Sequence, residues 1–243
     1  MNEKFTAEKT ENLITTYMER SLHASLKKHF CPDEACHEVK IGRFVADACS
    51  GGIVYEIQTA KLGNLAKKLK FYLESTDYQI VVVCPLAKNR RIIWLDEASG
   101  EMVKVPRLSS KHENLASGIA DLHYLKDFLG NERLSFCFVS MEIDEVRLLD
   151  GYGKQKKIRA TSVDRVAGEI YSFDYINNIE DVKNATLPLL PNGEFDRETL
   201  SKSLKLKGMK LWSAQKLLLE TGLISARKKG RKLIFEKIRL FKF

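Results

Sequence analysis

The sequence lacks any apolar run close to the ~20 residues that a membrane-spanning helix requires, which argues against an integral membrane protein. Its N-terminal stretch, MNEKFTAEKTENL, has no apolar core of the kind found in secretory signals. Only five cysteines are present, at positions 31, 36, 49, 84 and 137, and this odd number without regular spacing predicts reduced thiols. These absences together predict a soluble, cytoplasmic protein.

Three further features are absent: an internal repeat, a glycine-rich phosphate loop and an ordered Ser-His-Asp set. Repeat proteins, P-loop enzymes and triad hydrolases are therefore not indicated. The 243 residues are 44% hydrophobic and 30% charged, a composition typical of a globular protein that buries a sizeable core.

Positive charge is concentrated near the C-terminus. Residues 196–243 contain fourteen Lys or Arg and four Asp or Glu, a net charge of +10. Since the whole chain carries +8, residues 1–195 carry −2. Such asymmetry favours a segment that binds a polyanion, and a solvated basic tail is the alternative.

Hydrophobic periodicity predicts a mixed α/β sheet with helices on its faces. We expect helices over 8–30, 64–76 and 114–129, strands over 37–47, 53–59 and 78–87, a strand or strand pair over 134–150, and a hairpin over 90–105. Residues 150–165 are expected to form a polar loop or an exposed hairpin. A segment rich in Pro and Gly at 184–194 predicts two domains, 1–185 and 186–243.

Acidic and amide side chains surround the predicted turn at 49–52, CSGG. Glu56 and Gln58 are two residues apart in a strand, so their side chains point to the same face. Asp47 ends the preceding strand and is expected to be a diagonal neighbour of Glu56, within roughly 7 Å. Carboxylate and amide oxygens suit Mg²⁺ or Mn²⁺.

The segments VAD (45–47) and YEIQT (55–59) resemble the core of the PD-(D/E)XK nucleases, in which an Asp on one strand precedes (D/E)-x-K on the next. The helix predicted after these strands and the buried strand that follows it continue the order expected of that family, α-β-β-β-α-β, and the resemblance covers residues 8 to about 85. The resemblance implies a restriction-endonuclease-like fold. It further implies that Asp47, Glu56 and the main-chain carbonyl of Ile57 bind the metal ion, and that Glu19 adds a carboxylate.

Gln58 stands where the family usually has lysine. A neutral amide can orient the attacking water but hardly stabilises developing negative charge. Lys61 or Lys40 is a nearby source of that charge. The alternative interpretation of the whole set is a polar-faced hairpin with surface carboxylates, against which the apolar neighbours of Glu56 argue.

The C-terminal segment resembles a winged helix-turn-helix. Asp196 caps a predicted helix over 197–205, a second helix covers 211–221, and a hairpin follows with basic residues at its tip. The nucleic-acid-binding residues expected from this resemblance are Lys210, Ser213, Gln215, Lys216, Lys228, Lys229, Arg231 and Lys232. Winged helices also bind proteins or dimerise, which is the alternative.

Histidine and cysteine residues suggest one weaker alternative. His29, Cys31, Cys36 and His37 are close in sequence, but their spacing meets that of a zinc site only loosely. The cysteines are expected to fill small apolar spaces instead. His23 is expected to be a packing or surface residue.

Taken together, these patterns predict a Mg²⁺- or Mn²⁺-dependent nuclease that cleaves DNA, most simply double-stranded DNA, with the C-terminal domain binding it. The catalytic residues would be Glu19, Asp47, Glu56 and Gln58. A DNA-binding or regulatory protein without catalysis is the second hypothesis, and RNA or branched DNA are other substrates that fit. By analogy with double-strand cutters that pair two sites, a homodimer is one arrangement to expect.

Overall fold

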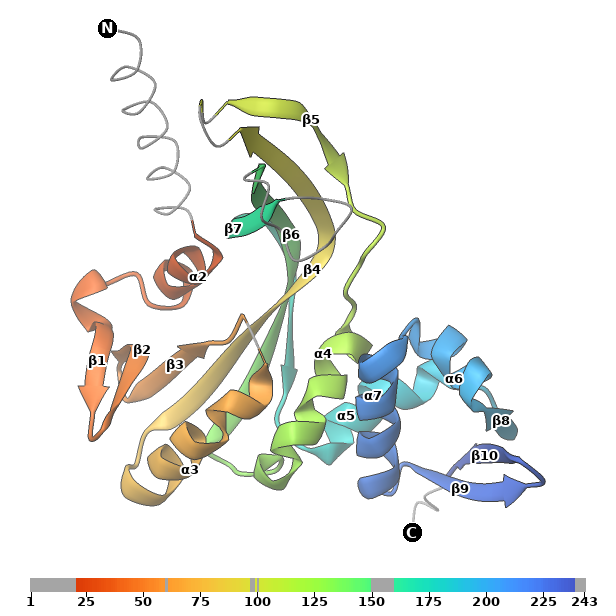
Figure 1. Cartoon of the computed structure of the whole chain (residues 1–243). Helices are drawn as coiled ribbons and strands as arrows, with labels where there is room; N and C mark the ends of the chain where they lie inside the picture. Colours follow the sequence, from red (N-terminus) through yellow and green to blue (C-terminus); the bar gives the residue numbers. More distant parts are fainter. Residues whose placement is uncertain (1–20, 60, 97–98, 100, 150–159, 239–243) are drawn as a thin grey trace, which may run out of the picture. The chain divides into compact units, whose positions relative to one another are not determined.

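A computed structural model describes residues 21–59, 61–96, 99, 101–149 and 160–238 (Figure 1). Glu19, one of the predicted catalytic residues, lies outside the described residues. Within the part of the chain that is described, no helix is long and apolar enough to cross a membrane.

One large mixed sheet dominates the structure, as predicted. Its strands are β1 (His37–Ile41), β2 (Phe44–Ser50), β3 (Ile53–Ile57), β4 (Gln79–Asp96), β5 (Met102–Leu108), β6 (Leu134–Leu149) and β7 (Thr161–Ile176). They pair in the order β1-β2-β3-β4-β6-β7, with β5 also on β4. The β3–β4 pair is parallel, whereas β1–β2 and β4–β5 are antiparallel.

The chain divides into two compact units. The first unit comprises Met1–Ser50, Pro85–Glu113 and Val139–Phe173, and the second comprises Gly51–Cys84, Asn114–Phe138 and Asp174–Phe243. The boundary predicted at residue 186 lies inside the second of these units, and the division into domains 1–185 and 186–243 stays a prediction.

The first unit begins with α2 (Leu22–Phe30), which covers the described part of the helix predicted over 8–30. The Ser21 hydroxyl caps it by accepting a hydrogen bond from the amide of Ala24 at 3.2 Å. A short 3₁₀ turn, η1 (Glu34–Cys36), leads to β1. The prediction of one strand over 37–47 is wrong: Gly42, with φ of 58°, turns the chain so that β1 and β2 form a hairpin.

Two further strands differ from the sequence predictions. The buried strand over 78–87 and the first arm of the predicted hairpin are a single strand, β4, whose far end pairs with β5. Ile93, Leu95 and Val146 form a small buried cluster there. Sequence pattern does not predict strand β7 beyond residue 165, because most of its side chains are exposed and no regular alternation marks it.

The second unit contains most of the helices. They are η2 (Leu62–Leu65), α3 (Ala66–Ser75), α4 (Leu115–Asp121), η3 (Leu122–Phe128), α5 (Ile179–Thr186), η4 (Leu187–Leu189), α6 (Arg197–Leu204) and α7 (Gly208–Glu220). In Figure 1, α3 and α4 lie on the same side of the β3–β4 pair. The predicted helices over 64–76 and 114–129 are confirmed, the second with a kink at Leu125.

A second, three-stranded sheet completes this unit. Strands β8 (Glu194–Asp196), β9 (Ile224–Lys229) and β10 (Lys232–Lys237) pair in the order β8-β10-β9. Asp196 caps α6 by accepting a hydrogen bond from the amide of Thr199 at 2.9 Å, as predicted. The side chains expected to face inward from α7 are buried, namely Leu211, Ala214, Leu217 and Leu218.

Candidate functional site

Asp47 lies on β2, in the first unit, with its side chain partly buried. The Nε2 atom of His23 on α2 lies 3.2 Å from its Oδ2 atom. His23 was expected to be a packing or surface residue, so its contact with a candidate metal ligand is new. One signal was present in the sequence: His23 follows Glu19 by four residues, which puts both on one face of the predicted helix.

Glu56 lies on β3, in the second unit, and only 2% of its surface is exposed. The Lys68 ammonium donates a hydrogen bond to its Oε2 atom at 2.5 Å. The Tyr72 hydroxyl donates one to Oε1 at 3.1 Å. Both donors come from α3. A buried carboxylate is costly unless it is paired, and these two groups supply a charge and a hydrogen bond.

Gln58 follows β3 directly. Its amide N–H donates to the carbonyl of Val83 at 2.8 Å, and its side-chain Nε2 donates to the carbonyl of Lys61 at 2.8 Å. The second bond turns the amide nitrogen toward the chain and leaves Oε1 as an oxygen acceptor without a partner among the described residues. Ile57, whose carbonyl was the third predicted metal ligand, ends β3 opposite Val83.

A cation that the sequence pattern did not single out lies beside Glu56. Lys61 and Lys40 are both exposed, whereas Lys68 lies directly on Glu56. Only the basic composition of the helix at 64–76 hinted at this, because nothing in a sequence says which of several lysines on a helix turns inward.

The donor chemistry at these positions suits a hard divalent cation, since two carboxylates, an amide oxygen and a carbonyl are all oxygen ligands. Within the described residues, however, no group of three or more His, Cys, Asp or Glu side chains is arranged to hold a metal ion. Asp47 belongs to the first unit and Glu56 to the second, and Glu19 lies outside the described residues.

The cysteine-rich turn of the weaker zinc alternative uses its side chains differently. Cys31 is buried, as expected of a small apolar filler. The His37 Nε2 atom lies 2.7 Å from the carbonyl oxygen of Cys31, and the Cys36 thiol contacts the Asp33 carboxylate at 3.7 Å.

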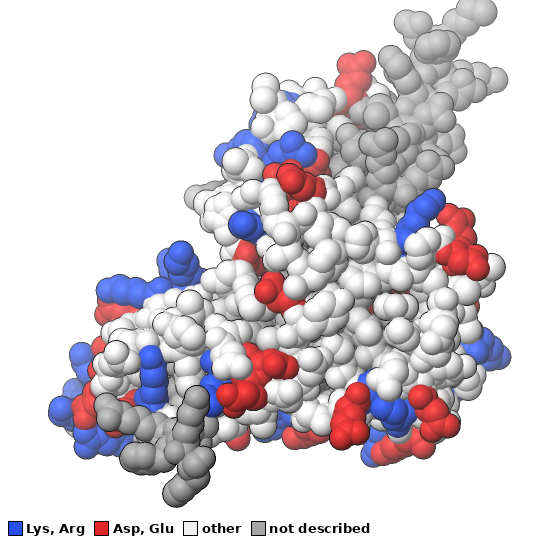
Figure 2. Space-filling model, turned by 180° about the vertical axis from the view of Figure 1, so that it is seen from behind, with Lys and Arg blue, Asp and Glu red and all other residues white. Residues whose placement is uncertain are grey.

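The hairpin formed by β9 and β10 carries a cluster of basic side chains. Lys228, Lys229, Arg231 and Lys232 are all exposed at its tip, where Gly230 adopts a φ of 61°. Figure 2 shows Lys and Arg side chains crowded along the lower left edge, the side on which the hairpin lies in that reversed view. This arrangement is the one predicted for phosphate contact.

The basic side chains of the hairpin differ in their partners. Arg227 and Lys229 both pair with Glu194, and the hydrogen bond from Arg227 lowers the pKa of that carboxyl below its ordinary value. Lys228, Arg231 and Lys232 have no ion pair within the described residues. They are therefore the hairpin cations most available to a polyanion.

Helix α7 was expected to present its polar face to DNA, but that face packs against α4 and η3. The Lys210 ammonium pairs with Asp121 and donates to the carbonyl of Ser117 at 3.1 Å. Ser213 is 1% exposed, and its hydroxyl hydrogen-bonds to that of Tyr124 at 3.3 Å. A side chain buried in this way cannot reach a DNA duplex.

The other two predicted contacts on α7 are only partly accessible. Gln215 and Lys216 are half-buried, and the Lys216 ammonium lies 6.0 Å from the centre of the Trp212 ring. The Gln215 Oε1 atom is buried with no hydrogen-bond partner among the described residues.

Charged side chains of η3 hold the C-terminal end of α7. The Lys126 ammonium donates a hydrogen bond to Glu220 Oε2 at 2.9 Å, and the His123 Nδ1 atom lies 3.0 Å from the same oxygen as an ion-pair contact. The hydrogen bond from Lys126 lowers the pKa of Glu220 below its ordinary value of 4.5.

The pairing of Glu56 leads to a first prediction. Lys68→Met leaves a buried carboxylate without its cation and is expected to reduce the free energy of unfolding by about 3–5 kcal/mol in urea denaturation. The control is Lys70→Met on the same helix, because the Lys70 side chain is 67% exposed and pairs only with exposed Glu74. The control should change stability by less than about 0.5 kcal/mol. If the two variants lowered the free energy of unfolding equally, the pairing of Lys68 with Glu56 would not be the cause of the loss.

The pairing of Glu220 leads to a second prediction. Because its pKa is lowered in the folded protein, its contribution to stability is present above pH 4.5 and is lost as the pH falls below that value. Glu220→Gln should therefore flatten the dependence of the urea midpoint on pH between about pH 5 and pH 3. Glu74→Gln, which alters an exposed pair, is the matched control and should follow the original protein. If Glu220→Gln left the pH dependence of the urea midpoint unchanged, the lowered pKa of Glu220 would not be coupled to stability.

Comparisons with known proteins place the chain in a family. The family described as "Domain of unknown function (DUF8091)" matches residues 20–176. An uncharacterized protein of Treponema pallidum (strain Nichols) is 29% identical over 179 residues, which cover 73% of this chain and 70% of that protein. No solved structure matches the chain. Since the family match spans more than half of the residues, this protein belongs to the DUF8091 family.

Proposed function

We propose that this protein is a metal-dependent nuclease that hydrolyses DNA phosphodiester bonds and uses its C-terminal hairpin to hold the DNA. The observation that carries the proposal is Glu56: a carboxylate buried in a mostly apolar strand, within the pattern Asp-x8-Glu-x-Gln, and held by a lysine and a tyrosine. Buried charged groups of this kind are more frequent at functional sites than elsewhere.

The order of the elements supports a restriction-endonuclease-like fold. Along the chain the structure runs α2, β1, β2, β3, α3, β4, which is the order α-β-β-β-α-β expected from the resemblance. Asp47 lies on the second of these strands and Glu56 on the third, as the nuclease pattern requires.

Each residue of the proposed site has a separate role. Asp47, Glu56 and the carbonyl of Ile57 would hold Mg²⁺ or Mn²⁺, and Glu19 would add a carboxylate. When bound, such an ion polarises the phosphate and lowers the pKa of a bound water. The free amide oxygen of Gln58 would orient the attacking water. Lys68 would supply the positive charge that stabilises the pentavalent phosphate and that the Gln58 amide lacks.

The C-terminal elements support a winged helix as the DNA-binding part. Their order is α5, β8, α6, α7, β9, β10, in which a three-helix set is interleaved with a three-stranded sheet. We propose that Lys228 and Arg231 make the principal phosphate contacts, together with Lys229 and Lys232. Lys210, Gln215 and Lys216 remain lesser proposed contacts, and Ser213 is left out because it is buried.

This arrangement implies binding that depends little on DNA sequence. In helix-turn-helix proteins the second helix reads base edges, but the polar face of α7 packs on α4 and η3. The hairpin cations contact phosphates, which position a protein on DNA without reading bases.

A second candidate function is DNA binding without catalysis, on a nuclease-like scaffold. Gln58 in place of lysine favours it. The ion pair between Lys68 and Glu56 also favours it, because a carboxylate already neutralised by an ammonium group has less need of a metal ion.

Cleavage is the third prediction. With Mg²⁺ or Mn²⁺ the protein should cut plasmid or linear DNA, and chelation should abolish cutting. Asp47→Ala and Glu56→Gln should each reduce the rate by at least about 100-fold, because each removes a direct metal ligand. Single-stranded DNA, branched DNA and RNA tested beside duplex DNA would identify the preferred substrate.

Glu74→Gln serves as the control, since Glu74 is an exposed acid on α3. Its cleavage rate should equal that of the original protein, and circular dichroism should show all variants folded. If the original protein and both site variants degrade nucleic acid equally slowly while binding it, the nuclease proposal is wrong and the second candidate stands.

Phosphate binding by the hairpin is the fourth prediction. Removing one cation that neutralises a phosphate lowers the slope of log K against log salt concentration by about 1. The double variant Lys228→Ala, Arg231→Ala should therefore lower the slope by about 2 in fluorescence-anisotropy titrations with duplex DNA.

Lys202→Ala is the matched control, because Lys202 is an exposed lysine on α6 that pairs with Glu198. For this variant, the slope of log K against log salt concentration should equal that of the original protein. An unchanged slope in the double variant would show that the hairpin does not contact DNA.

A further inference from the structure

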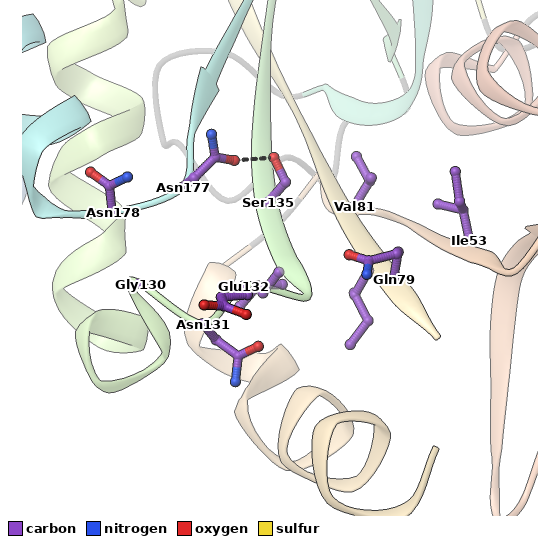
Figure 3. A pocket seen from close by; sticks show the side chains of 11 residues that line it. Ile53, Gln79, Val81, Gly130, Asn131, Glu132, Ser135, Asn177 and Asn178 are labelled. Carbon is purple, nitrogen blue, oxygen red and sulfur yellow. Dashed lines mark hydrogen bonds between the residues drawn. The ribbon is translucent and has the colours of Figure 1, made fainter. Parts of the chain in front are cut away.

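A cavity of about 400 Å³ opens on the second unit, away from the residues discussed so far. It lies at the start of β3 and β4, beside the start of β6 and the loop that leads from β7 to α5 (Figure 3). Strand alternation puts Ile53 and Val81 on the face of the sheet opposite to that of Glu56. The cavity is therefore separate from the proposed nuclease site.

The two sides of the cavity differ in chemistry. Figure 3 shows Ile53 and Val81 on one side, where their half-buried side chains form an apolar surface. On the other side, Asn177 and Asn178 carry amides, and the Ser135 hydroxyl donates a hydrogen bond to Asn177 Oδ1 at 2.6 Å. This bond fixes which way the Asn177 amide points.

Several amide groups in the cavity have hydrogen-bonding capacity left over. The Nδ2 group of Asn177 has no partner within the described residues, because the bond from Ser135 uses only its oxygen. The Asn178 oxygen accepts from the amide of Asp181 at 3.1 Å, which likewise leaves its Nδ2 group available. The exposed Gln79 side chain adds a donor and an acceptor at the apolar side.

Charge limits what the cavity can bind. Among the described residues that line it there is no Lys, Arg or His, and Glu132 is the one charged side chain. A phosphate or carboxylate would find no positive partner there and would be repelled by Glu132. The ligand must therefore be neutral or weakly basic, with a flat apolar face and polar edges.

We propose that the cavity binds an unpaired nucleobase, with the base lying on Ile53 and Val81 and the amides of Asn177 and Gln79 hydrogen-bonded to its edge. A nucleobase has the required flat apolar faces and polar edges, and amide side chains pair well with such edges. Nucleobase binding itself does not require that the protein is a nuclease. Combined with the proposed function, on which this second step rests, it identifies the nuclease substrate as DNA with an unpaired or flipped-out base.

The test uses free nucleosides and no metal ion, so that it does not depend on cleavage. Isothermal titration of the full chain with adenosine, guanosine, cytidine and thymidine should show saturable binding of at least one, with a Kd of about 1 mM or lower. D-ribose and inorganic phosphate, titrated in parallel, should not bind.

Two variants locate the site. Gln79→Ala and Asn177→Ala should each weaken nucleoside binding by about tenfold, the effect of removing one hydrogen bond. Asn192→Ala, at an exposed amide elsewhere in the second unit, is the control and should bind as the original protein does. Gln79 is exposed, so its replacement keeps the test valid even if Asn177→Ala fails to fold.

Three results would overturn the inference: no saturable nucleoside binding, equal binding of ribose, or unchanged affinity in Gln79→Ala. Failure of the nuclease proposal would look different, because the protein would then bind nucleosides without cleaving DNA.

Discussion

The need to neutralise Glu56 constrains the second unit more than any other single interaction. A carboxylate that is 2% exposed in a strand of Ile, Val and Tyr is stable only with a partner beside it. Lys68 and Tyr72 provide that partner, one turn apart on the same face of α3. The register of α3 on β3 is thus set by polar groups as well as by buried Leu69. An apolar residue at position 56 would remove this constraint, so the presence of Glu there is consistent with a chemical role.

The C-terminal elements show how packing decides which side chains stay accessible. A helix-turn-helix segment has one polar face for DNA, but in α7 this face carries the contacts of Lys210, Ser213 and Glu220 with α4 and η3. Side chains that hold α7 in place in this way are less available to a DNA groove. In the β9–β10 hairpin, Lys228, Arg231 and Lys232 have no ion pair within the described residues, and this leaves them as the principal candidates for phosphate contact.

Many elements of the fold could be predicted from local pattern. Hydrophobic periodicity predicts the helices over 64–76 and 114–129, Asp196 predicts the cap of α6, and Gly230 predicts the turn of the C-terminal hairpin. Each of these signals acts on neighbouring residues. The predictions of secondary structure were wrong where the pattern of apolar and polar residues is ambiguous. Gly42 breaks a strand that alternates well on either side of it, and β7 is exposed on much of its length, so its alternation carries no hydrophobic signal. The partner of Glu56, twelve residues away, was not predictable from spacing either.

By itself, the sequence determined the local features: the positions of the acids on their strands, the glycine turn before β3, the capped helices of the C-terminal segment and the basic hairpin tip. These depend on residues close in the chain, whose steric and hydrogen-bonding preferences act over a few positions. Only the tertiary structure decided that His23 contacts Asp47, that Lys68 neutralises Glu56, that Ser213 is buried and that amides gather at one cavity. Those pairings join groups that are distant in sequence, and burial makes them energetically necessary only once the elements pack.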